Sequence, residues 1–183
     1  LFALFTASTV AEKPGTEKRE LVIKRIILSN SRPAAYLAGK IIATFCLVLL
    51  QMTFVILVSH VMLGVFKGQS VQFWIGLMLM LVVYAMTMAG LSALYTSIML
   101  RLQSIDTANG VFLLLTMAFG VVGGNFVPIY VFPQWLQRAG EWTPNGLTLA
   151  VLTEWIQFGD FAVLWSPVAA LSGFALICLL VGI

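Results

Sequence analysis

Charged residues are scarce in this chain. They make up 9% of its 183 residues, whereas soluble domains carry about 25%, and 61% of the residues are hydrophobic. This composition excludes a soluble globular domain. Cysteine is scarce as well: Cys46 and Cys178 lie far apart and match no spacing typical of a zinc site or a disulfide framework. We expect both thiols to be inert groups within helices.

The few charges are unevenly spread. Ten of the 17 fall within residues 12–40, and uncharged runs cover 41–66, 68–100, 107–137 and 161–183. Each run exceeds the roughly 20 residues that a helix needs to cross a bilayer. The runs are apolar on every side and lack the alternation of barrel strands, so they are predicted to be helices. The predicted fold class is therefore an all-α polytopic membrane protein.

The predicted organisation is one transmembrane domain over residues 1–183. We expect four full transmembrane helices and the end of a fifth, a cytoplasmic amphipathic helix and short extracellular helices. A helix starting just after Pro144 and capped near Asn145 is too short to span. The predicted segments are the end of a transmembrane helix at 1–10, a cytoplasmic segment at 12–40, spans at 41–66, 73–100 and 110–127, outer re-entrant or surface helices at 128–161, and a span at 162–183.

The distribution of Lys and Arg predicts the orientation. Residues 12–40 and Arg101 carry eight of them on one side, whereas Lys67 and Arg138 are the two on the other. The positive-inside rule places the first group in the cytoplasm. The expected location is a cell membrane, with a bacterial inner membrane favoured, and the basic segment is expected to meet membrane lipid rather than nucleic acid. Tryptophans, which favour the interface, fall at or beyond the predicted outer ends, at Trp74, Trp135, Trp142, Trp155 and Trp165.

The cytoplasmic segment contains a helix-compatible stretch at 16–30. Two interpretations are open: a solvated basic loop, or a helix on the inner membrane surface with one face toward lipid and the other toward a partner. The second is favoured because aliphatic residues are frequent between 21 and 28. The polar face would carry Glu17, Glu20 and Lys24, and the apolar face Val22, Ile23 and Ile26.

No pattern typical of an enzyme site is found. The Gly39-Lys40 pair has Ala34 and Ile41 where a phosphate-binding loop needs Gly and Ser or Thr. His60 stands alone in a predicted span, and a structural role is favoured over a functional one. We therefore expect no catalytic residue, cofactor or metal in this chain.

Small residues recur at helical spacing within two of the predicted spans. Ala85, Ala89 and Ala93 follow a small-xxx-small repeat, and Gly120 with Gly124 forms GxxxG. Packing within the chain and a dimer face both remain open.

Two motifs carry a resemblance to a known family. The first runs from Glu17 to Ser29 and continues through Pro33 to Gly39 and Lys40, directly before a span. The second comprises residues 123–128, 132–137 and 143–148, with Gly123, Gly124, Pro128, Pro133 and Pro144 as its main positions. In order and spacing these motifs resemble the membrane subunit of ABC-2 type exporters, apart from Asn30 where the family usually has Pro.

The resemblance implies that residues 1–10 end the second helix and that the four spans are helices three to six, so the first helix and most of the second would be missing. It also implies a second permease subunit, as a homodimer or heterodimer, and a separate ATPase subunit that holds ATP and Mg. The coupling helix within 12–32 would dock on that ATPase through Glu17, Lys18, Arg19, Glu20, Lys24 and Arg25.

The substrate path of the family is lined largely by its second and fifth helices. Candidate lining residues here are Phe112, Leu115, Met117 and Phe119, whose apolar character suits a lipophilic or amphipathic substrate such as a drug, a peptide antibiotic or a lipid-linked molecule. Two alternatives belong to other classes: a membrane scaffold that does not transport, and an ion-coupled secondary carrier. All charged residues can be placed outside the spans, which weakens the carrier.

Overall fold

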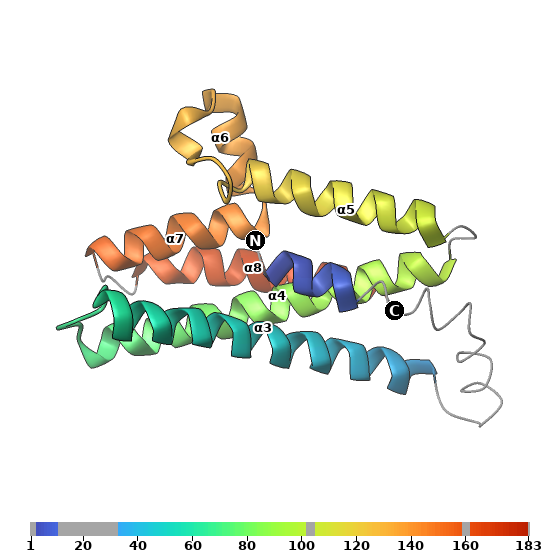
Figure 1. The fold of residues 1–183 in the computed structure, drawn as a ribbon, viewed down its shortest axis with the longest axis horizontal. Helices are drawn as coiled ribbons and strands as arrows, with labels where there is room; N and C mark the ends of the chain where they lie inside the picture. Colours follow the sequence, from blue (N-terminus) through green and yellow to red (C-terminus); the bar gives the residue numbers. More distant parts are fainter. Residues whose placement is uncertain (1–2, 11–32, 102–104, 159–161, 183) are drawn as a thin grey trace.

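The structure is a computed structural model that describes residues 3–10, 33–101, 105–158 and 162–182. These residues form helices, and no β-strand occurs among them. Most of the helices run along one long axis (Figure 1). The all-helical fold class predicted from the sequence is confirmed. The predicted coupling helix at 16–30 lies outside the described residues.

From residue 33 onward the described helices follow one another with few intervening residues. A short helical segment, 3–10, precedes them. The labelled elements are α3 (Pro33–Leu63), α4 (Val71–Arg101), α5 (Ile105–Val122), the 3₁₀-helix η1 (Ile129–Val131), α6 (Gln134–Glu141), α7 (Pro144–Phe158) and α8 (Ala162–Gly182).

Three of the helices are long and apolar enough to cross a membrane. The candidate spans are Ala35–Leu63 in α3, Val71–Met99 in α4 and Leu164–Gly182 in α8, which agrees with three of the four predicted spans. Helix α3 has 31 residues, or about 46 Å at 1.5 Å per residue, against about 30 Å of hydrocarbon. Its continuous helix places Gly39 and Lys40 inside α3 rather than ahead of it.

The fourth predicted span, 110–127, falls on α5, which has 18 residues and ends at Val122. That is about 27 Å of helix, slightly less than the hydrocarbon thickness. A count of four full spans therefore stays a prediction. Helix α7 starts near the end of α5. It runs beside α8 toward the end of the bundle that holds the α3–α4 connection (Figure 1).

Helix α4 forms the centre of the bundle. It contacts α3 and α8 most extensively, and also α5 and α7. In an apolar 18-residue stretch of each span, 72% of the residues are buried in α4, against 11% in α3 and 28% in α8. Helices α3 and α8 therefore expose long apolar faces that suit lipid or a second subunit.

Aromatic residues anchor two core clusters along α4. In one, the Tyr95 ring stacks on Phe112 of α5, with ring centroids 4.5 Å apart. In the other, Trp155 of α7 stacks on Phe73 and donates a hydrogen bond from Nε1 to the Phe73 carbonyl at 3.3 Å. Trp155 is buried rather than exposed, because α7 packs on the start of α4. Trp135, Trp142 and Trp165 are exposed.

Small residues allow the helices to approach closely within this chain. Ala85, Ala89 and Ala93 are all buried. A Cβ atom added at Gly90 would lie 2.8 Å from the carbonyl oxygen of Ala175 in α8. Of the two interpretations of the small-xxx-small repeat, the structure supports packing within the chain.

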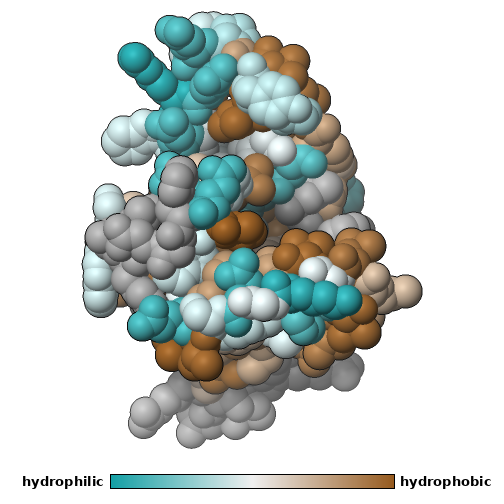
Figure 2. All heavy atoms as spheres, turned by 90° about the vertical axis from the view of Figure 1, so that its left-hand side faces the viewer, coloured by the Kyte–Doolittle hydropathy of each residue, from teal (hydrophilic) through white to brown (hydrophobic). Residues whose placement is uncertain are grey.

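His60 lies near the end of α3, half-buried against Trp74. The two rings meet edge to face, with centroids 5.3 Å apart, and the His60 Nδ1 atom has no hydrogen-bond partner among the described residues. This aromatic contact supports the structural role that the sequence favours. The end of the bundle that holds the α3–α4 connection presents hydrophilic side chains between hydrophobic patches (Figure 2).

Candidate functional site at the α5–α6–α7 corner

The sequence-predicted site residues divide into four groups, of which the candidate path residues on α5 are described last. Glu17, Lys18, Arg19, Glu20, Lys24 and Arg25 lie outside the described residues. Gly39 is exposed on α3, and Lys40 lies one turn after Tyr36 with its Nζ atom 5.4 Å from the ring centroid. The third group, Gly123, Gly124, Pro128, Pro133 and Pro144, lies in one short stretch, from the end of α5 to the start of α7. This stretch, residues 120–148, is here named the corner.

The corner begins where α5 ends in a Schellman motif. Gly124 has a φ of 77°, a left-handed conformation that glycine adopts without strain. The amide of Asn125 donates to the carbonyl of Gly120 at 3.0 Å, and the amide of Gly124 donates to that of Val121 at 3.1 Å. These two hydrogen bonds satisfy carbonyls that the helix end would leave free. Helix α5 therefore ends before residue 127, where the predicted span ends.

Each proline of the corner precedes or starts a helix. Pro128 is the N-cap of η1, Pro133 is the N-cap of α6, and Pro144 is the first residue of α7. Proline suits these positions because the N–H that it lacks would have no partner within the helix. The sequence therefore divides this stretch into short helices instead of one span.

Thr143, rather than Asn145, caps α7. The Thr143 hydroxyl accepts a hydrogen bond from the Gly146 amide at 3.0 Å and donates one to the Gly140 carbonyl at 2.7 Å. A Thr side chain at the position before the first helical residue satisfies a free amide of the first turn. The same hydroxyl thereby joins the end of α6 to the start of α7.

Glycines bring the three helix ends into direct contact. A Cβ atom at Gly140 would lie 2.5 Å from the carbonyl oxygen of Val122, and one at Gly123 would lie 3.0 Å from Thr143 Oγ1. A Cβ atom at Gly146 would meet the Gly140 carbonyl. Sequence reasoning did not single out Gly140, since its need for a small side chain arises from α5 and not from α6.

One buried hydrogen bond ties the corner to the centre of the bundle. The Tyr84 hydroxyl of α4 donates to Oδ1 of Asn145, and both residues are buried. The Asn145 Nδ2 atom has no partner among the described residues. Sequence reasoning missed Tyr84, because no local pattern links a tyrosine in an apolar helix to an asparagine 61 residues away.

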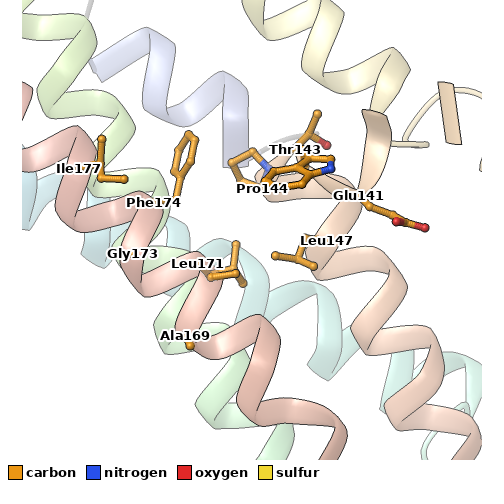
Figure 3. A pocket seen from close by; sticks show the side chains of 11 residues that line it. Glu141, Thr143, Pro144, Leu147, Ala169, Leu171, Gly173, Phe174 and Ile177 are labelled. Atoms are coloured by element: carbon orange, nitrogen blue, oxygen red, sulfur yellow. The ribbon is translucent and has the colours of Figure 1, made fainter. Parts of the chain in front are cut away.

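A groove of about 560 Å³ lies between the corner and α8. Its walls are mostly apolar, and among the described residues that line it Glu141 is the one with a charge. Figure 3 shows Leu147 pointing across the groove toward Leu171, with Phe174 and Ile177 further along α8.

The structure separates the four candidate path residues on α5. Phe112 is buried against Tyr95 in the core. Leu115 and Met117 are exposed, and Phe119 is partly buried. The buried side of α5 also carries Ala108 and Thr116, and the opposite side is covered by no described element.

A family model described as ABC-2 family transporter protein matches residues 1–183, the whole chain. No curated protein matches the chain, and no solved structure matches it.

Proposed function

The chain belongs to the ABC-2 transporter family, and from that membership we propose that it is the permease subunit of an ATP-driven exporter. In this proposal two permease subunits enclose a substrate path across a bacterial inner membrane. A separate ATPase subunit binds ATP and Mg and docks on the coupling segment within residues 12–32. The substrate is lipophilic or amphipathic.

The observation that carries the second subunit and the path is the uncovered side of α5. Leu114 is 71% exposed, and Val111, Leu113, Leu115 and Val121 are exposed beside it. Such an apolar face suits a wall shared with another permease subunit. Leu115 and Met117 are available to a substrate on this side, whereas Phe112 holds α5 against α4.

The proposed mechanism is mechanical. Nucleotide binding closes the ATPase subunits, and the coupling segment passes that movement to the helices, which alternate between inward and outward access. The free energy is coupled because nucleotide and substrate each bind one conformation better than the other. The Tyr84–Asn145 hydrogen bond would make the corner move together with α4.

The lack of buried charged residues in the described part of the chain favours transport driven by ATP over transport driven by an ion gradient. Ion-coupled carriers place ionisable groups near the bilayer midplane. In the described part of this chain, no Asp, Glu, Lys or Arg side chain is buried. This supports the exporter over the ion-coupled carrier.

Reconstitution with an ATPase subunit tests the proposal. The full chain, co-expressed with an ATPase carrying GxxxxGK[ST], should co-purify with it, and amphipathic compounds should stimulate hydrolysis. In inside-out vesicles such a compound should accumulate only with ATP, and a Lys→Ala change in that ATPase motif should abolish accumulation. A chain that binds no ATPase would support the scaffold, and accumulation driven by an ion gradient without ATP would support the carrier.

A further inference from the structure

We propose that the groove between the corner and α8 is a binding site for an amphipathic cation. The cationic head would lie at Glu141, and the apolar body would lie between α7 and α8. This is a statement about binding by the permease alone, so its test requires neither an ATPase nor transport.

The size and lining of the groove fit one small molecule. Binding sites for such molecules usually measure about 300–1,000 Å³ and are mostly apolar with a few polar groups, and this groove measures about 560 Å³. Small residues on α8, Ala169, Ala170 and Gly173, help to line the hollow. No atom lies within 4 Å of the position that a Cβ atom at Gly173 would take, so the groove is open at that point.

The charge at the rim selects a cation. Glu141 is exposed and ends α6, where the helix dipole adds partial negative charge. Its carboxylate points outward, away from Leu171 and Phe174 (Figure 3), so the cationic head would lie at the outer edge of the groove. Within the described part of the chain, Glu141 has no ion pair, even with Arg138 one turn earlier on α6.

The neighbouring polar and aromatic groups agree with this selection. Trp142 lines the groove beside Glu141 and is 87% exposed, so its ring is available to an ammonium group. The Gly146 amide at the start of α7 already donates to Thr143. The helix start therefore offers little to a competing anion.

Two matched probes test the sign of the charge. We would titrate the full chain, in micelles of a neutral maltoside detergent, with a dansyl-labelled hexyl chain ending in trimethylammonium, and with the same chain ending in sulfonate. Fluorescence polarisation should show tighter binding of the cation. Glu141→Gln should weaken binding of the cation about threefold to fivefold, as expected for a partly exposed ion pair, and leave binding of the sulfonate unchanged or tighter. The matched control is Glu154→Gln, on the exposed side of α7, which should change neither affinity.

A second variant tests the location. Gly173→Leu adds a side chain where the groove is open. It should displace about two methylene groups of each probe from the groove, and so weaken binding of both probes about tenfold. If Gly173→Leu changes neither affinity, the probe binds elsewhere and the proposal fails. If Glu141→Gln weakens both probes equally, or neither, the carboxylate does not select the cation and the proposal fails as well.

Membrane lipids with a cationic amine are the competing occupant. Adding phosphatidylethanolamine to the micelles should leave the affinity for the cationic probe unchanged. Displacement of the probe by this lipid would assign the groove to membrane lipid and overturn the assignment to a free amphipathic cation.

Discussion

The hydrogen bond from Tyr84 to Asn145 is the most consequential single contact of the corner, because it is buried and joins two helices. Tyr84→Phe removes the donor and leaves both polar groups of Asn145 unpaired. A buried group that loses its partner destabilises a protein by about 1–3 kcal/mol, and hydrogen bonds between membrane helices contribute about 1–2 kcal/mol at most. We expect the free energy of unfolding to fall by about 1–2 kcal/mol.

Reversible unfolding in mixed micelles of neutral and anionic detergent measures this change. Tyr130→Phe is the matched control. It makes the same chemical change at an exposed position, so it should leave the free energy of unfolding unchanged. A double variant, Tyr84→Phe with Asn145→Ala, should be less destabilised than the sum of the two single variants. Full additivity would show that the two side chains do not interact.

The glycines of the corner make a second residue-scale prediction. Gly140→Ala would place a Cβ atom 2.5 Å from the Val122 carbonyl oxygen, so helix ends must move apart. Overpacking of this kind destabilises by about 1–3 kcal/mol. The control is Gly110→Ala in α5, where nothing lies within 4 Å and a better helix former should stabilise by up to about 1 kcal/mol. Equal thermal stability of the two variants in detergent would contradict the close contact.

At the scale of elements, the long uncharged runs were sufficient to predict α3, α4 and α8, because burial in lipid requires apolar residues all round a helix. The end of α5 was also predictable, since Gly123 and Gly124 carry a local signal. The burial of Trp155 was not. Interface preference treats each tryptophan alone, whereas Trp155 is buried because α7 packs on Gly76, whose missing side chain makes room for the ring.

The corner shows the same division between local and tertiary signals. Its prolines predict short helices from local chemistry, and α6 and α7 have 8 and 15 residues. The contact of Gly140 with α5, and the pairing of Tyr84 with Asn145, depend on how separate helices meet. No local sequence pattern indicates which helices pack together, so the groove beside α8 was not predictable either.

At the scale of the whole molecule, the charge asymmetry predicts which ends of the helices face the cytoplasm. A single cysteine at Gln69, exposed in the α3–α4 connection, should react with a membrane-impermeant maleimide from outside only. A single cysteine at Gln103 should react from the cytoplasmic side only. Native Cys46 and Cys178 must first be replaced, since Cys46 is exposed. Labelling of Gln69→Cys from the cytoplasmic side alone would show that the predicted topology is wrong and that the orientation is the reverse.

Coupling to an ATPase is the other whole-molecule prediction, and it depends on the charges that precede α3. If residues 16–30 pass motion to the helices, then Glu17→Lys with Glu20→Lys should weaken ATPase association and uncouple transport. The protein should still fold and insert, because surface charge changes usually alter stability by less than about 0.5 kcal/mol. Weakened docking rather than complete loss is expected, since the contribution of an interfacial charge depends on its burial.

The lipid-anchor interpretation of the same segment predicts the opposite response. Added positive charge should strengthen attraction to the anionic inner leaflet, by about 1 kcal/mol per basic residue near the surface, and leave ATPase association unchanged. The measurement is co-purification of the ATPase with the double variant, together with ATP-dependent transport in vesicles. Glu154→Lys on α7 is the control, because it makes the same reversal at an exposed position far along the chain. If the double variant associates and transports like the unchanged protein, Glu17 and Glu20 do not form the coupling surface. A loss seen equally with Glu154→Lys would indicate a general effect of charge.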